Sequence, residues 1–236
     1  MVTVNNSKGR YGERGNVLFL ILIAVALFAA LSYAVTQSTR SGGGSGDNET
    51  SLISSAQLTQ YPASVRTSVV RMIIGGVDVG NLEFNPPSGT NGFATLTSPA
   101  VGVFHPQGGG STYATAPGEM MASGGAGTWI FNAENQIELI GTTNPGGTPT
   151  AATADIIAFL PGITLTLCNR INKELGLPAT PPTETGIDFV TDMVDGVGIG
   201  GGGDTIGEDV VALDGEPFGC FNQGGTYVYY HVLVER

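Results

Sequence analysis

The N-terminal part of the chain contains one long apolar stretch that carries no charge. Residues Asn16–Thr39 include no Asp, Glu, Lys or Arg, and Val17–Val35 is almost entirely apolar. A helix of this length rises about 28 Å, close to the roughly 30 Å thickness of the hydrocarbon layer of a bilayer. A buried core helix would show a polar face at each turn, and this stretch shows none. The pattern predicts a transmembrane helix over residues 16–40, preceded by a basic cytoplasmic leader over residues 1–15.

A flexible linker and a second helix are predicted next. Residues 41–46 read SGGGSG, a composition typical of a flexible tether. Asp47–Ile74 has an apolar stripe near helical spacing, and Gly75 and Gly76 would end this helix. Pro62 should kink or split it, because proline lacks the backbone N–H and clashes with the preceding turn.

The remainder of the chain reads as short strands on irregular loops, with one more helical region. Thr153–Leu175 is predicted to be helical, interrupted at Pro161 and Gly162, so that the clean helix covers Thr164–Leu175; Asp188–Val194 is a candidate for a short helical turn. Thr226–Val234 has high β-propensity and predicts a C-terminal strand. The other candidate strands are Val77–Phe84, Phe93–Leu96, Val101–Phe104, Thr128–Phe131 and Gln136–Ile140. These elements predict an α+β domain over residues 47–236.

The charge balance limits the possible partners and the compartment. The chain has 9 Lys and Arg against 20 Asp and Glu, a net charge of −11. This balance excludes a nucleic-acid binder that neutralises phosphates, which needs a basic face. The few basic residues near the N-terminus precede an acidic body, which is typical of an exported domain. We therefore expect an extracytoplasmic domain 47–236.

Two features of the C-terminal region suggest chemistry. The two cysteines, Cys168 and Cys220, would form a disulfide in an exported protein, and two buried thiols are the alternative. Acidic residues gather between them, and carboxylates on a flexible loop can bind calcium, although no EF-hand pattern is present. The candidate calcium ligands are Asp192, Asp195, Asp204, Glu208 and Asp209. A solvated acidic loop without a metal is the alternative, and no other cofactor is expected.

Motifs that would indicate an enzyme carry little weight. Gly196, Gly198 and Gly201 fit a G-x-G-x-x-G spacing, but they lie in an acidic glycine-rich loop rather than between a strand and a helix. The two histidines, His105 and His231, have no partners at a catalytic spacing and are interpreted as structural. We expect no catalytic residues and no enzymatic activity.

The start of the apolar stretch allows three kinds of processing. It could be a secretory signal cleaved near Ser32–Ala34, an uncleaved anchor, or a prepilin-type segment. The third interpretation depends on Gly15, which follows basic residues and directly precedes the apolar stretch. This arrangement resembles the processing site of type IV prepilins and pseudopilins, which implies cleavage by a prepilin peptidase between Gly15 and Asn16. The sequence departs from that family at Leu20, where a glutamate is usual.

The C-terminal region adds to this resemblance. Cys168 on a predicted helix, a glycine-rich loop, Cys220 and a tyrosine-rich last strand are similar to the disulfide-bounded loop of many type IV pilins and pseudopilins. The resemblance implies a pilin-like fold, in which a helix packs on an antiparallel sheet. It also implies a structural, possibly minor, subunit of a type IV pilus-like or pseudopilus filament at a bacterial surface.

The partners and the location follow from the same resemblance. The partners would be copies of this chain or other pilin-like subunits, together with the inner membrane. The location would be the inner membrane, with the domain outside the cytoplasm, or an extracellular filament. The rival interpretation is a membrane-tethered or secreted binding domain that does not polymerise, which Leu20 and the SGGGSG linker favour.

Overall fold

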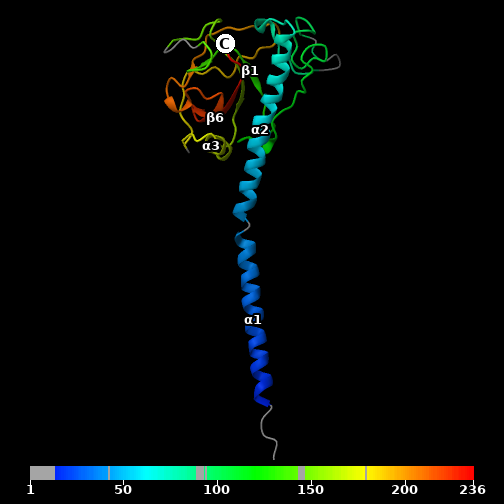
Figure 1. Cartoon of the computed structure of the whole chain (residues 1–236), viewed down its shortest axis with the longest axis vertical. Helices are drawn as coiled ribbons and strands as arrows, with labels where there is room; N and C mark the ends of the chain where they lie inside the picture. Colours follow the sequence, from blue (N-terminus) through cyan, green and yellow to red (C-terminus); the bar gives the residue numbers. More distant parts are fainter. Residues whose placement is uncertain (1–13, 42, 89–92, 94, 143–146, 179) are drawn as a thin grey trace, which may run out of the picture. The chain divides into compact units, whose positions relative to one another are not determined.

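The chain forms two compact units, residues 1–50 and residues 51–236. The computed structural model describes residues 14–41, 43–88, 93, 95–142, 147–178 and 180–236 (Figure 1). Most of the predicted leader, residues 1–13, lies outside the described residues.

The first unit is helical. Helix α1 covers Arg14–Ser41 and holds the apolar stretch, with polar residues in its last turns. Among the described residues, none of the helices has an apolar segment of sufficient length to span a bilayer. This finding corrects the prediction of an N-terminal transmembrane helix over residues 16–40.

Helix α2 covers Gly43–Ile74 and is longer than predicted. Gly43–Gly46, which were expected to belong to the flexible linker, form its first turn, and Gly42 lies outside the described residues. Pro62 lies inside α2 without splitting it. Proline removes one hydrogen bond from a helix interior, but tertiary packing can outweigh this cost. In the second unit, Leu58, Val65 and Val69 of α2 are buried in a hydrophobic core.

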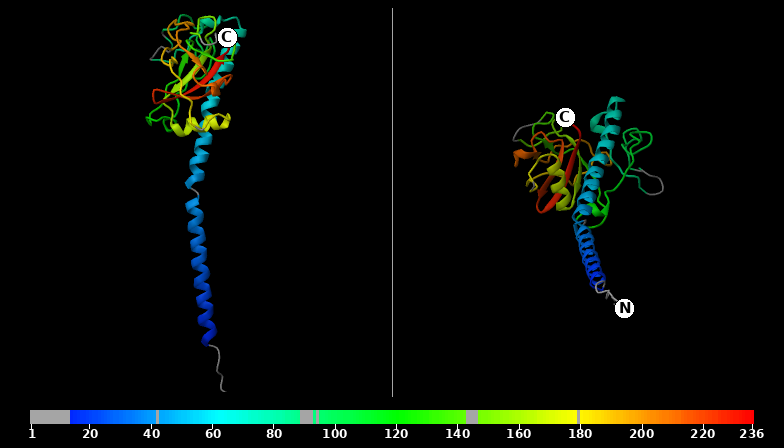
Figure 2. Two further views of the ribbon diagram at one scale, coloured as in Figure 1. Left: turned by 90° about the vertical axis from the view of Figure 1, so that its left-hand side faces the viewer. Right: turned by 60° about the horizontal axis from the view of Figure 1, so that its bottom comes forward.

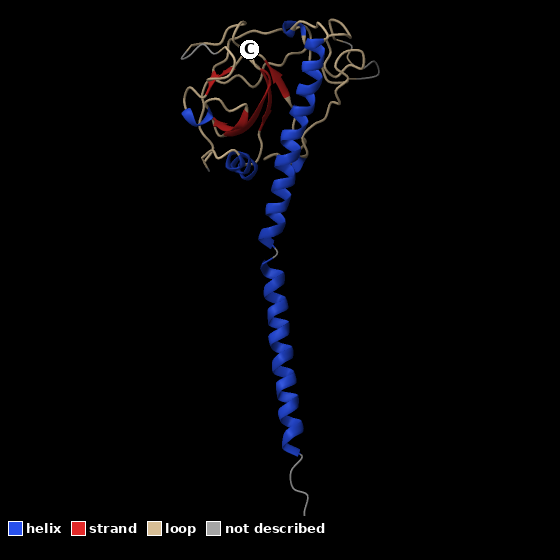
Figure 3. Cartoon of the chain, in the orientation of Figure 1, coloured by secondary structure: helices blue, strands red, loops and turns tan. Residues whose placement is uncertain are grey.

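The second unit is built around a small antiparallel sheet. In the described residues its four strands have the order β1 (Ile130–Asn132), β3 (Ile156–Pro161), β6 (Thr226–Val234) and β5 (Phe218–Gln223). A separate parallel pair joins β2 (Gln136–Ile137) to β4 (Thr205–Ile206). Loops make up much of the rest of this unit (Figure 3). Short 3-10 helices lie in those loops: η1 (Val79–Asn81), η2 (Gly118–Met120) and η3 (Val211–Leu213).

A hydrophobic core lies on each face of the four-stranded sheet. Alternate residues of β3 point to opposite faces, so Ile156 and Leu160 join one core while Ile157 and Phe159 join the other. The first core includes four residues of α2, namely Leu58, Val65, Val69 and Met72. Helix α2 runs alongside the sheet in both further views (Figure 2). The second unit therefore combines helices with an antiparallel sheet, as in an α+β layout.

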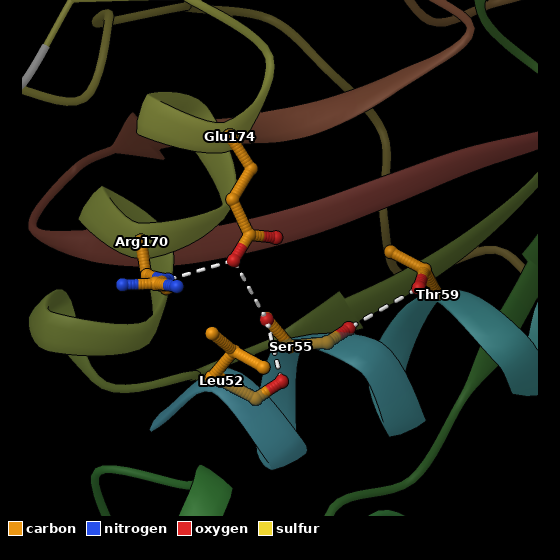
Figure 4. A network of polar contacts seen from close by, with 5 residues as sticks. All are labelled: Leu52, Ser55, Thr59, Arg170 and Glu174. Carbon is orange, nitrogen blue, oxygen red and sulfur yellow. Dashed lines mark hydrogen bonds and ion pairs between the residues drawn. The ribbon is translucent and has the colours of Figure 1, made fainter. Parts of the chain in front are cut away.

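Helix α3 (Leu165–Glu174) agrees closely with the predicted helix. The side chain of Thr164 caps it by accepting a hydrogen bond from the backbone N–H of Leu167. Figure 4 shows how α3 is joined to α2: one oxygen of Glu174 accepts hydrogen bonds from Arg170 Nε at 2.7 Å and from Ser55 Oγ at 3.2 Å. These contacts hold α3, which carries Cys168, beside the first core.

Several predicted elements differ from the structure. The region before α3, expected to be helical from Thr153, instead contains the central strand β3. Because β3 is buried on both faces, its sequence lacks the polar alternation of a half-exposed strand. Among the described residues, the other expected strands are present only in part, as β1, as β2 and as the bridge between Glu83 and Gly102. Asp188–Val194, expected to form a short helical turn, is not helical. Residues 89–92 and 94 lie outside the described residues.

Both edges of the four-stranded sheet are covered by other backbone or side-chain groups. At the β5 edge, the side-chain amide of Asn172 donates to the carbonyl of Cys220 and accepts from its N–H, at 2.8 and 3.0 Å. The same edge pairs with the segment around Thr183, where Asn222 N–H donates to the Pro182 carbonyl. At the β1 edge, the outward N–H of Phe131 donates to the carboxylate of Asp192.

Candidate functional site

Helix α1 presents a continuous apolar surface. Its large apolar side chains are exposed over about four helical turns, from 40% for Ile23 to 76% for Phe28. We call these residues the α1 surface: Phe19, Leu20, Ile21, Leu22, Ile23, Val25, Leu27, Phe28, Leu31 and Tyr33. Soluble proteins rarely expose an apolar patch of this kind unless another molecule covers it. The α1 surface is therefore a candidate interaction site.

The predicted processing site lies at the start of the same helix. Gly15 and Asn16 belong to the first turn of α1. Leu20, where the resembling family usually has a glutamate, is 58% exposed among the other apolar residues. Cleavage between Gly15 and Asn16 stays a prediction.

The disulfide predicted from the sequence is present. Cys168 of α3 and Cys220 of β5 are bonded, with their Cα atoms 5.4 Å apart. Both residues are fully buried in the first core. The bond therefore ties a helix to an outer strand of the sheet across 52 residues of chain.

The five candidate calcium ligands make different contacts within the second unit. Asp192 accepts a hydrogen bond from the N–H of Phe131 in β1, while Asp195 accepts one from the side-chain amide of Asn85. Each of these two carboxylates therefore holds a loop to another segment of the second unit.

The other three candidates surround a carboxyl group that the sequence analysis missed. Glu208 interacts electrostatically with Asp204 and with Asp209. These two aspartates also act on Glu184, which is 1% exposed. We call these four residues the Glu184 cluster. One oxygen of Glu184 accepts from Gly207 N–H at 3.2 Å, and the other is buried without a hydrogen-bond partner. Nothing in the sequence around Glu184 distinguishes it from the exposed acidic residues nearby.

A metal at this cluster has no support in the geometry. Within the described ranges, no group of three or more His, Cys, Asp and Glu side chains is arranged to hold a metal ion. Asp209 instead accepts two hydrogen bonds from Thr185. The N–H and the hydroxyl of Thr185 both donate to one carboxylate oxygen of Asp209, at 2.8 Å. Calcium binding by the C-terminal loop stays a prediction.

Glu184 should make the stability of the second unit depend on pH. Burial, assisted by the charges of Asp209 and Asp204, raises the pKa of Glu184 from 4.5 to about 7. Between these values the folded chain holds a proton that the unfolded chain has lost, so the free energy of unfolding should fall as the pH rises from about 4.5 to 7. We expect Glu184 to account for roughly 2–3 kcal/mol of that fall.

The variant Glu184→Gln tests this expectation. A neutral amide can still accept the hydrogen bond from Gly207, so the variant should lose much of the fall in the free energy of unfolding, measured by urea denaturation at pH 4.5–8. Burial also raises the pKa of Asp155 and Asp192, each to about 6, so part of the fall should persist. Glu119→Gln, at an exposed position, is the matched control and should behave like the unmodified chain. An equal fall in all three proteins would contradict the role given to Glu184.

The histidines have structural surroundings. His231 lies in β6, stacks on Phe218, and shares a hydrogen bond with the Tyr229 hydroxyl at 3.0 Å. Burial lowers the pKa of His231 to about 4, so this side chain is neutral at physiological pH. His105 accepts a hydrogen bond from the Gln107 N–H within its own turn.

Comparison with known proteins gives no further assignment. No family model, no curated protein and no solved structure matches this chain.

Proposed function

We propose that this chain is a structural subunit that assembles with copies of itself through the α1 surface, as part of a type IV pilus-like or pseudopilus filament. The observation that carries the proposal is the continuous exposure of the large apolar side chains from Phe19 to Tyr33. Burying a single large apolar side chain is worth about 1.5–3 kcal/mol, so the ten side chains of this surface offer a large gain on association.

The occupant we propose is the α1 surface of another copy of the chain. Helices pack by fitting ridges of side chains into grooves, and the alternation of large residues with Ala24, Ala29 and Ala30 provides both. The sequence from Phe19 to Tyr33 contains no charged residue, and Leu20 stands where the resembling family usually has a glutamate. Assembly would therefore depend on apolar packing alone.

The second unit supports a role as the outer part of such a filament. It has its own cores on both faces of the sheet, built from residues of the second unit. Its helix-on-sheet arrangement and its disulfide are the features that the pilin resemblance implies. The disulfide also favours a location outside the reducing cytoplasm.

The variant Val25→Lys tests the proposal. Val25 is 63% exposed in the middle of the α1 surface, and lysine is a good helix former that would place a charge in the packed interface. We expect the full-length chain to form large assemblies, seen by sedimentation velocity and negative-stain electron microscopy, and we expect Val25→Lys to remain small. Val190→Lys is the matched control, because Val190 is 77% exposed in the second unit.

The same measurements separate the proposal from its rival. If the full-length chain stays monomeric, or if Val25→Lys assembles as well as the control, assembly through the α1 surface is wrong. A monomeric full-length chain would favour the non-polymerising binding domain.

A further inference from the structure

A cavity of about 280 Å³ lies in the second unit, where three loop segments converge. The first segment follows α2 and provides Gly80, Leu82 and Glu83, the second provides Thr97 and Val101, and the third is the glycine-rich loop that provides Val197. The volume approaches the lower end of the range for small-molecule sites, which are usually concave and partly apolar.

Glu83 is held rigidly in the wall of this cavity. Its backbone N–H donates to the Val101 carbonyl at 3.1 Å, and its carbonyl accepts from Val103 N–H at 2.9 Å. Glu83 is only 3% exposed. The backbone nitrogen of Thr97 lies 3.2 Å from each of its carboxylate oxygens and donates a hydrogen bond to them. A charged group is therefore fixed at the cavity by backbone contacts from a neighbouring segment.

The carboxylate of Glu83 lacks a cationic partner in the described residues. The ion pairs found there join Arg66 to Glu235 and Arg170 to Glu174. One N–H shared by two oxygens leaves most of the acceptor capacity of a carboxylate unused. Burying a carboxylate without a counter-charge is costly, and a cationic ligand would remove that cost.

We propose that the Glu83 cavity binds an alkylammonium group, that is, a primary ammonium on a short aliphatic chain. The ammonium would donate to the Glu83 carboxylate, while Val101 and Val197 provide apolar contacts for the aliphatic chain. An anion would be repelled by the same carboxylate. A metal ion fits less well, because the described residues hold no group of three metal-binding side chains. A free amine and the side chain of a lysine share this chemistry.

Isothermal titration calorimetry on the full-length chain can test the proposal with n-butylammonium chloride, at constant ionic strength. We expect millimolar binding, at least about tenfold tighter than that of n-butanol, because a hydrogen bond to a charged group contributes more than one between neutral groups. The variant Glu83→Gln keeps the size of the side chain and removes its charge, so the preference for the cation should disappear. Glu119→Gln changes the net charge equally at an exposed position and should keep that preference.

The outcomes are decisive in either direction. Absence of n-butylammonium binding, equal binding of n-butanol by the unmodified chain, or an unchanged preference in Glu83→Gln would overturn the proposal. The comparison of the two compounds on the unmodified chain remains valid even if Glu83→Gln does not fold. Putrescine and N-acetyl-lysine methylamide then distinguish the sources: tighter binding of putrescine indicates a free amine, and tighter binding of the lysine derivative indicates a lysine side chain of a protein.

Discussion

Replacing both cysteines, as Cys168→Ala with Cys220→Ala, should lower the free energy of unfolding of the second unit by about 4 kcal/mol. The bond closes a loop of 52 residues, and an open loop gives the unfolded chain far more conformations. Urea unfolding of the oxidised chain and of the double variant measures the difference. Since small domains are stable by only about 5–15 kcal/mol, the double variant should be close to unfolded at elevated temperature.

A reducing agent provides the control for this prediction. Dithiothreitol should destabilise the unmodified chain by a similar amount and leave the double variant unchanged. If the double variant were as stable as the oxidised chain, the disulfide would not be the constraint that joins α3 to β5.

Phe159→Ala should also destabilise the second unit, by about 3–5 kcal/mol. Phe159 lies in the central strand β3, is fully buried, and faces the second core beside Tyr230 of β6. Its truncation would leave a cavity that the rigid sheet cannot close. The measurement is the midpoint of urea unfolding, followed by tyrosine and tryptophan fluorescence.

Leu139→Ala serves as the control, because Leu139 is 71% exposed and its truncation opens no cavity. The control should change the free energy of unfolding by less than about 0.5 kcal/mol. If Phe159→Ala lowered the free energy of unfolding by no more than the control does, the core around β3 would be loosely packed.

The elements with strong local signals could be predicted from the sequence. Helix α3 has a capping threonine before it and a glycine after it, and strand β6 is rich in Tyr and Val. The pairing of Cys168 with Cys220 also followed from their number, because only one intramolecular pair exists. In these cases the information lies within a few residues of the element itself.

The elements set by tertiary packing could not be predicted in the same way. Strand β3 is covered on both faces, so its apolar residues do not alternate with polar ones. The helical predictions for residues 153–160 and 188–194 failed because neighbouring segments, not local propensity, decide these conformations. Helix α2 passes through Pro62 because its stripe is held in the first core.

The candidate sites also differ in whether the local sequence indicates them or whether they depend on the tertiary structure. The apolar residues of the α1 surface were visible in the sequence, although the predicted transmembrane helix was wrong. Which segment each acidic side chain contacts depends on the path of the loop between Asp192 and Asp204. The Glu83 cavity is formed by three loops, of which the first and the last lie more than a hundred residues apart in the sequence. A single sequence does not indicate that these loops meet.

The covered edges of the sheet restrict how molecules of this protein can join. An open edge strand offers a row of unpaired N–H and carbonyl groups that can continue the sheet into a neighbouring chain, which is the usual start of amyloid-like aggregation. Here the side-chain amide of Asn172 forms the two hydrogen bonds with Cys220 of β5 that a neighbouring strand would form. At β1, the carboxylate of Asp192 accepts the hydrogen bond from the outer N–H of Phe131. A protein kept at high local concentration would benefit from this protection, since its molecules could crowd together without fusing their sheets.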